Sequence, residues 1–162
     1  MSVESLFLTA CAAKLDQSAD RIGVCLGKLS EDQVWVRGHE NENAVGNLVL
    51  HLCGNVRQWV MHGLGGQPDV RTRDAEFSAA GGSAPGELAS KVRQTIDDAR
   101  AVIASLRPDQ LTATYTIQNR TVSGVEAVLN VVEHFAQHTG QIIFATKNLT
   151  GLDLGLAMPR RR

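Results

Sequence analysis

Apolar residues recur every three or four positions over long stretches of this chain, and shorter polar connections separate these stretches. The first stretch runs from about Ser2 to Leu29. Its apolar or small positions alternate steps of three and four residues: Leu8, Cys11, Leu15, Ser18, Ile22, Cys25 and Leu29. This spacing puts all of them on one face of a helix. We therefore expect an amphipathic helix with two cysteines in its buried seam.

Two further stretches have the same helical period. The second covers residues 44–63, with Asn43 as a suitable N-cap and Gly63 as its end. Its apolar side is made of Val45, Leu48, Leu52, Val56 and Trp59. The third stretch begins at Ser83 and Pro85, which are typical of a helix start. Its apolar positions include Leu88, Val92, Ile96 and Leu106.

Residues 63–83 connect the second and third helices. Connections of this length are uncommon in compact domains unless they are functional or disordered. The centre of the connection, RTRDAEF, mixes charged residues with one phenylalanine. This composition is more typical of a lid that is tethered to the bundle than of a flexible linker.

The period changes before the last helix. Residues 111–117, LTATYTI, alternate apolar residues with threonines, which is typical of a short half-exposed strand. The QNR that follows can turn the chain back on itself. Ser123 and Glu126 then form a capping box for a fourth helix. We expect this helix to run to about Leu149, with Gly151 at its C′ position.

Four amphipathic helices can bury their apolar stripes against one another. We therefore predict an all-α fold, a four-helix bundle in a single domain over residues 1–162. A long loop joins helices 2 and 3, and a small β-hairpin-like segment precedes helix 4. A chain of 162 residues is long enough to bury a sizeable core.

Charge and composition narrow the possible partners. The formal net charge of −1 gives no basis for nucleic-acid binding, which needs a basic face. The basic run PRRR, residues 159–162, is interpreted as a solvated tail. No apolar stretch approaches the ~20 residues needed to span a bilayer, and charges within the first thirty residues argue against a signal peptide. We therefore expect a cytoplasmic protein with no membrane partner.

Three cysteines, an odd number, do not indicate a disulfide framework. Cys11 and Cys25 lie on the apolar seam of the first helix and are interpreted as small core residues. Cys53 has no second cysteine at CxxC spacing. We expect none of the three to be a reactive thiol or a metal ligand.

Two histidines lie four residues apart in the fourth helix. Positions at this spacing differ by about 40° around a helix, so His134 and His138 share a narrow polar strip with Asn130 and Gln141. Buried imidazoles need partners. Hydrogen bonds to amide or backbone groups are one solution, and a divalent metal ion is another.

The position of His51 favours a metal ion as the partner of these histidines, because His51 lies beside the apolar stripe of the second helix. Asn47 and Asn55 flank it by one turn on each side, where they could orient a ring or a bound water. Facing helices of a bundle can supply ligands to one ion. His51, His134 and His138 would leave a fourth position open, which is the catalytic arrangement rather than the structural one.

The two remaining histidines have no place in this site. His62 lies eleven residues after His51, about 16 Å along the helix, and His39 has no partner at ligand spacing. Glu133 is about 100° away from the histidine strip and is not expected to act as a base there.

One histidine in the second helix and an H-x3-H pair in the fourth resemble the DinB/YfiT-like superfamily. ENAVGNLVLHLCGNVRQWV and VVEHFAQHTGQI are similar to that family's two metal-bearing helices, and RDAEFS is similar to the segment that follows the second helix. The resemblance covers essentially the whole chain. It implies a bundle that binds one divalent ion, zinc or nickel, through His51, His134 and His138. It also implies a homodimer and, in some relatives, transferase or isomerase reactions with a low-molecular-weight thiol.

These observations lead to two hypotheses. The first is a metal-dependent enzyme with a small-molecule substrate, in which the open position binds a thiol for a transferase reaction or activates water for hydrolysis. Arg71, Arg73, Asp74 and Glu76 are its candidate helpers, although an exposed charged loop explains them as well. The second is a non-catalytic, homodimeric, stress-related bundle that binds the ion for stability.

Overall fold

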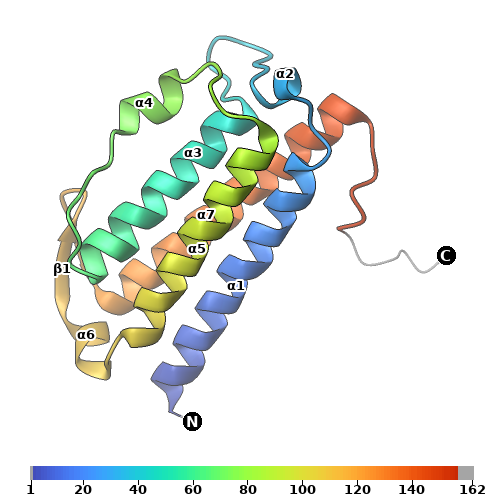
Figure 1. Cartoon of the computed structure of the whole chain (residues 1–162). Helices are drawn as coiled ribbons and strands as arrows, with labels where there is room; N and C mark the ends of the chain where they lie inside the picture. The colour runs from blue at the N-terminus through green and yellow to red at the C-terminus, as the bar shows by residue number, and fades with distance from the viewer. Residues whose placement is uncertain (1, 157–162) are drawn as a thin grey trace.

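The computed structural model describes residues 2–156, so the basic run at residues 159–162 lies outside the described part of the chain. The fold is an all-α four-helix bundle, as predicted (Figure 1). Its long helices are α1 (Val3–Leu26), α3 (Val45–Val56), α5 (Pro85–Ser105) and α7 (Gly124–Thr150). The π-helical turns of η1 (Arg57–Leu64) continue α3 without a break.

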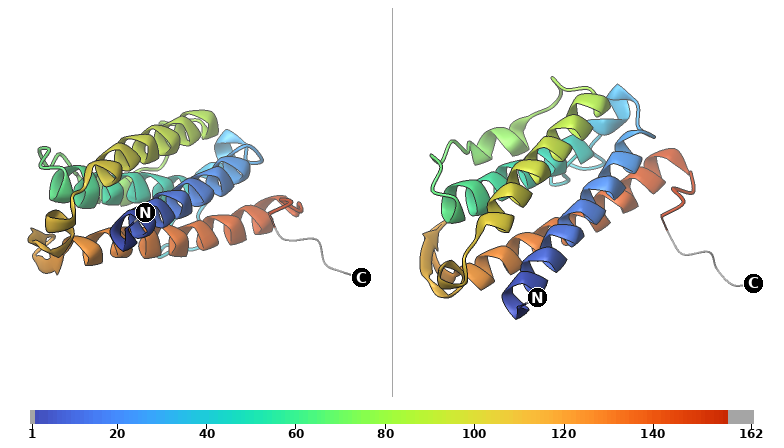
Figure 2. Two further views of the ribbon diagram at one scale, coloured as in Figure 1. Left: turned by 90° about the horizontal axis from the view of Figure 1, so that it is seen from below. Right: turned by 60° about the horizontal axis from the view of Figure 1, so that its bottom comes forward.

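Each long helix packs against two neighbours. α1 lies between α5 and α7, and α3 also lies between α5 and α7. The chain runs up α1, down α3, down α5 and up α7 in the view of Figure 1, and Figure 2 shows the same four helices from two other sides. α3 and α7 are therefore antiparallel neighbours, which brings the middle of one helix beside the middle of the other.

The parallel course of α3 and α5 explains the long connection between them. The chain leaves η1 at one end of the bundle and must return to the opposite end before α5 can begin (Figure 1). α3 and η1 together span roughly 30 Å. The returning segment, residues 65–84, covers this distance along the outer side of α3 and contains the short helix α4 (Arg73–Ser78), which the sequence did not predict.

α3 is enclosed on nearly all sides because α4, α5 and α7 all contact it. Polar as well as apolar residues of α3 are consequently buried, among them Asn47, His51 and Asn55. The α1 seam agrees with the prediction, since all seven of its positions from Leu8 to Leu29 are buried.

Several predicted boundaries were wrong by a few residues. The N-cap of α3 is Ala44 rather than Asn43, because the Asn47 side chain accepts the Ala44 backbone N–H from inside the first turn. α5 likewise begins after Ala84 rather than Ser83, with Pro85 as its first residue. α1 ends at Leu26, and the polar segment after it contains the short helix α2 (Glu31–Val34).

The predicted strand over residues 111–117 was too long. Leu111 belongs to α6 (Pro108–Thr112), a short helix that begins with a proline. The strand β1 is Thr114–Ile117, and it pairs antiparallel with β2 (Arg120–Ser123). Gln118 and Asn119 join the two strands with positive φ angles of 51° and 60°, as a two-residue hairpin turn requires.

The start and end of α7 agree with the sequence. Ser123 and Glu126 form the predicted capping box, and Gly151 ends the helix with a φ of 69°. Among residues 2–156, no helix combines the length and the apolar character needed to cross a membrane.

Candidate metal centre

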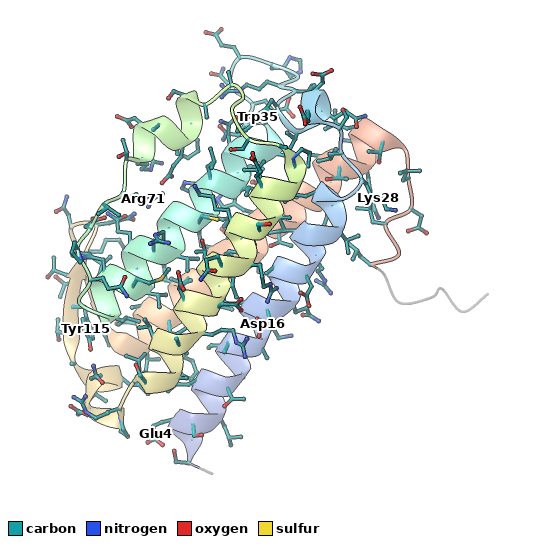
Figure 3. All side chains as sticks on the ribbon, viewed as in Figure 1. Glu4, Asp16, Lys28, Trp35, Arg71 and Tyr115 are labelled. Carbon is teal, nitrogen blue, oxygen red and sulfur yellow. The ribbon has the colours of Figure 1, made fainter. Side chains whose placement is uncertain are left out.

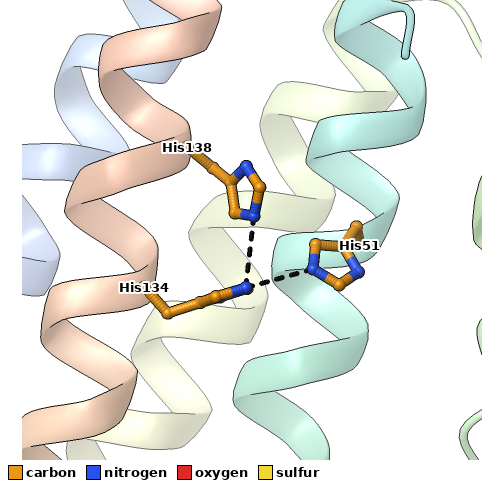
Figure 4. Close-up of side chains that lie close together, drawn as sticks. All are labelled: His51, His134 and His138. Atoms are coloured by element: carbon orange, nitrogen blue, oxygen red, sulfur yellow. Dashed lines mark hydrogen bonds between the residues drawn. The ribbon is translucent and has the colours of Figure 1, made fainter. Parts of the chain in front are cut away.

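The three predicted histidines come together between α3 and α7. Nε2 of His134 lies 3.2 Å from Nε2 of His51 and 3.1 Å from Nε2 of His138 (Figure 4). The three ligand nitrogens all lie within 4.8 Å of one another. Two imidazole nitrogens bound to one tetrahedral zinc ion are about 3.4 Å apart, so the spacing is close to that of a single coordination sphere.

Two of the rings have polar partners at Nδ1, on the side away from the cluster. His51 Nδ1 lies 3.1 Å from a carboxylate oxygen of Glu76 and 3.1 Å from Nη2 of Arg71, and His138 Nδ1 lies 2.6 Å from the side-chain oxygen of Gln141. In the tautomer with the proton on Nδ1, each ring donates to its oxygen partner. In that tautomer the Nε2 atoms of His51 and His138 present bare lone pairs to the cluster.

This donor set fits a divalent cation. If Nε2 of His134 carried a proton, it could donate to only one of its two neighbours, which would leave the other lone pair without a partner. His134 Nδ1 is buried and forms no hydrogen bond with the described residues. With the protons of His51 and His138 on Nδ1, a positive ion at the centre satisfies all three Nε2 lone pairs at once.

Burial keeps two of these imidazoles neutral. Burial, together with the neighbouring His138 and His51, lowers the pKa of His134 to about 4. Burial also lowers the pKa of His51, against the opposing effect of its hydrogen bond to Glu76. Neutral imidazole is the form that binds metal ions, so near neutral pH these two rings need lose no proton before binding.

Glu76 belongs to a buried ion pair with Arg71. The Arg71 guanidinium donates two hydrogen bonds to the carboxylate, Nε to Oε1 and Nη2 to Oε2, both at 2.8 Å, and a third to Gln58. The side chains of Arg71 and Glu76 are 3% and 9% exposed. Figure 3 labels Arg71 where the returning segment passes α3. A charge-assisted, bidentate pair of this kind holds the carboxylate in one orientation.

Gly54 provides the space for this ion pair. A Cβ atom at Gly54 would lie 1.9 Å from Glu76 Oε1 and 3.1 Å from Arg71 Nε. Gly54 comes one turn after His51 on α3, so the absence of its side chain lets the carboxylate approach the helix closely enough to reach the His51 ring.

Asn47 fixes the end of α4 rather than a histidine ring. Its side chain donates to the backbone oxygens of Glu76 at 2.9 Å and Ala79 at 2.8 Å. It also accepts from Arg37, whose guanidinium binds the same stretch of backbone at Phe77 and Ala79. The sequence suggested that Asn47 could orient a ring or a bound water, whereas its side chain holds the segment that carries Glu76. The side-chain oxygen of Asn55 is buried without a partner among the described residues.

The other candidates divide between buried and exposed. One interpretation of RTRDAEF was an exposed charged loop. This interpretation was wrong for Arg71 and Glu76, whose side chains are buried, and right for Arg73 and Asp74, which are exposed. Arg73 lies over the Phe77 ring at 4.9 Å. His62 Nδ1 donates to the backbone oxygen of Gln67 in the returning segment, away from the cluster. His39 and Glu133 are exposed.

All three cysteines are free and buried. Burial raises the pKa of the Cys53 thiol to about 11 and raises the pKa of Cys11 and Cys25 as well. A thiol with a raised pKa is a poor nucleophile at neutral pH. Reactive thiol chemistry from these side chains is therefore disfavoured, as expected from the sequence.

The chain matches one family model and resembles several solved structures. The model of a family described as a protein of unknown function, DUF1572, matches residues 2–162. No curated protein matches the chain. A conserved protein from Enterococcus faecalis has a similar structure, with a TM-score of 0.74, 13% identity, and coverage of 94% of this chain and 99% of that one.

Two similar structures are described as DinB-like. The one from Bacillus subtilis has a TM-score of 0.68 at 15% identity, covering 89% of this chain and 93% of that one. The one from Bacillus cereus has a TM-score of 0.71 at 13% identity, covering 91% of this chain and 93% of that one. At these identities the likeness shows the fold.

The position of Gly54 generates a test of the Glu76 contact. We expect Gly54→Ala to displace the carboxylate from His51 and to weaken zinc binding about 10- to 100-fold, the usual effect of losing a group that orients a ligand. Glu76→Gln should weaken binding in the same direction. Competition with a chromophoric chelator measures the zinc Kd of each variant.

Gly23→Ala is the matched control, because a Cβ atom at Gly23 meets nothing within 4 Å. It should bind zinc as the unchanged protein does. Equal zinc affinity in the Gly54→Ala and Gly23→Ala proteins would show that Glu76 does not support His51.

Proposed function

This chain belongs to the DUF1572 family and has the DinB-like fold, and we propose that it is a divalent-metal-dependent enzyme. Its reaction is the transfer of a low-molecular-weight thiol to a small electrophilic substrate. His51, His134 and His138 are the proposed ligands of one zinc or nickel ion. The observation that carries the proposal is the convergence of three Nε2 atoms, two of them on rings with a hydrogen-bonding partner at Nδ1.

The number of ligands supports catalysis over a purely structural role. Within residues 2–156, the three histidines are the whole of the ligand cluster. Structural zinc sites have four protein ligands, whereas three protein ligands leave a position for an exchangeable group. A divalent ion held here supplies an open position at which a thiol loses its proton more easily.

The remaining side chains favour thiol transfer over hydrolysis. Activation of water is commonly assisted by a free carboxylate, but Glu76 faces Nδ1 of His51 and is held by Arg71. The thiol must come from outside, because the three cysteines are buried. In the transfer, the thiol proton passes to solvent, a sulfur–carbon bond forms, and the leaving group departs with its bonding electrons. Free cysteines also fit a reducing compartment, and the cytoplasm is the proposed location.

A groove beside the histidines offers room for the substrate. It has a volume of about 680 Å³ and lies between residues 36–43, the start of α3 and the second half of α7. Gln141 lines the groove and also accepts the hydrogen bond from His138. Leu48, one turn before His51, lines the opposite side. The three histidines do not line the groove, but it borders residues next to two of the proposed ligands. Its size is within the usual range for small-molecule sites.

A homodimer is part of the proposal, through a surface that differs from the α1 seam. That seam packs into the core, but α7 has a second stripe that stays partly or fully exposed: Val125, Leu129, Val132, Ala136 and Ile143. About 200° around the helix separates Ala136 from His134, so the stripe faces away from the cluster. α1 packs beside α7 and exposes Val3 and Leu6. A second copy can cover both stripes across a two-fold axis.

The first expected result concerns metal content. Protein purified without a histidine tag should hold about one divalent ion per chain by elemental analysis, since three neutral histidines converge on one point. His134→Ala should abolish stable binding. His62→Ala should retain the ion, because His62 lies outside the cluster. Equal metal content in the His134→Ala and unchanged proteins would refute the ligand assignment.

The second expected result concerns the open coordination position of the metal ion. The test uses a Cys11→Ala, Cys25→Ala, Cys53→Ala variant loaded with cobalt. A thiol that reaches the ion as thiolate should produce a sulfur-to-cobalt charge-transfer band in the near ultraviolet. Glutathione, cysteine and other cellular thiols are titrated in turn, with His134→Ala as the control. Saturable binding with a strong preference for one thiol supports the transferase.

Other outcomes of the same titration decide among the alternatives. A spectrum that responds to hydroxamates or carboxylates but to no thiol would favour a metal-dependent hydrolase. A spectrum that responds to none of them would favour the non-catalytic metal-binding protein.

The third concerns the dimer. Sedimentation at micromolar concentration should give twice the mass of one chain, and Leu129→Glu should give the mass of a single chain because it buries a charge in the interface. Leu152→Glu is the control, since Leu152 is similarly exposed, at 48% against 52% for Leu129, but lies beyond α7. A single-chain mass for the unchanged protein would contradict the proposal.

A further inference from the structure

A second cavity lies behind the metal centre, on the outer side of α3. It has a volume of about 330 Å³ and is enclosed by α3, η1 and the returning segment, with Lys91 of α5 at one side. Arg71 and Glu76 line this cavity and also contact His51, at 3.1 Å in each case. The ion pair is therefore a wall shared by the cavity and the histidine cluster.

The lining of the cavity combines an apolar surface with an excess of positive charge. Leu50, Met61, Val70 and Ala75 provide apolar atoms. Three cationic side chains, Arg57, Arg71 and Lys91, lie in the lining with two carboxylates, Asp69 and Glu76.

The bonding of these groups shows which charges remain available to a ligand. Arg71 and Glu76 neutralise each other, and Asp69 accepts hydrogen bonds from Gln58 and from the Arg71 backbone. Lys91 forms no ion pair with any residue in the described part of the chain, and Arg57 has one long contact of 3.8 Å to Asp98. The cations at the side of the cavity are thus available to an anionic ligand, whereas its carboxylates are engaged.

We infer that this cavity binds a small carboxylic acid with an apolar body and that the bound acid strengthens metal binding at the histidines. The apolar body fills the space beneath the returning segment, and the carboxylate pairs with Lys91 and Arg57. Binding itself needs no metal ion, whereas the coupling rests on the proposed function.

The coupling follows from the shared wall. A carboxylate beside the ion pair adds negative charge near the cluster and so favours a cation there. A ligand that packs between α3 and the returning segment also holds Glu76 against His51. Both effects increase metal affinity, and linkage requires the metal to increase the affinity for the acid by the same factor. We expect a factor on the order of five.

Calorimetric titration with 3-phenylpropanoate tests the binding of the acid on metal-free protein. Saturable binding is expected, with 3-phenylpropanol and 3-phenylpropylamine binding much more weakly. Lys91→Met should weaken binding of the acid up to about fivefold, as expected for one exposed ion pair, and Ala75→Leu should abolish it by filling the cavity. Arg107→Met is the charge-matched control, because Arg107 is 66% exposed and does not line the cavity. Unchanged binding of the acid by Ala75→Leu would overturn the assignment. So would binding of the alcohol or the amine as tightly as the acid.

The zinc Kd, measured with and without saturating 3-phenylpropanoate, tests the coupling. The unchanged protein should bind zinc about fivefold more tightly with the acid present. Ala75→Leu should show no such change, which separates the cavity from direct contact between the acid and the ion. An equal zinc Kd under both conditions would refute the coupling. A chain that binds neither zinc nor nickel would refute the proposed function and the coupling while leaving the metal-free binding result intact.

Discussion

The buried ion pair between Arg71 and Glu76 orients one ring of the histidine cluster. Both of its side chains lie 3.1 Å from Nδ1 of His51, and Nε2 of that ring faces His134 on α7. The pair exists because α3 and α5 run parallel, which sends the intervening segment back along α3 (Figure 1). The path of the chain between η1 and α5 thus places a charged pair beside a histidine at the contact between α3 and α7.

The parts of the fold that follow from helical periodicity were predictable. The α1 seam, the capping box at Ser123 and the end of α7 at Gly151 each depend on residues that lie close together in the sequence. The convergence of the histidines was predictable for a related reason. His134 and His138 share a helix face at their spacing, and His51 lies at the edge of an apolar stripe that had to face the bundle interior.

The support of the cluster was not predictable in the same way. Arg71 and Glu76 lie in a charged segment without periodicity, and their burial depends on a missing side chain at Gly54, many residues earlier. Asn47 gives the same lesson, because its partners at Glu76 and Ala79 are 29 and 32 residues away. Leu111 shows the opposite error: an alternating pattern indicated a strand, but the proline at the start of α6 made the first residues helical.

The separation of the ligands along the chain has a consequence for folding. His51 and His134 are 83 residues apart in sequence, so the unfolded chain brings them together only at a large cost in conformational entropy. An ion that requires both residues binds the native state far better than the denatured ensemble. By mass action it would shift the unfolding equilibrium toward the folded chain in proportion to the logarithm of its free concentration. The melting temperature would then follow the cellular supply of the ion, and starvation for it would shorten the lifetime of the protein.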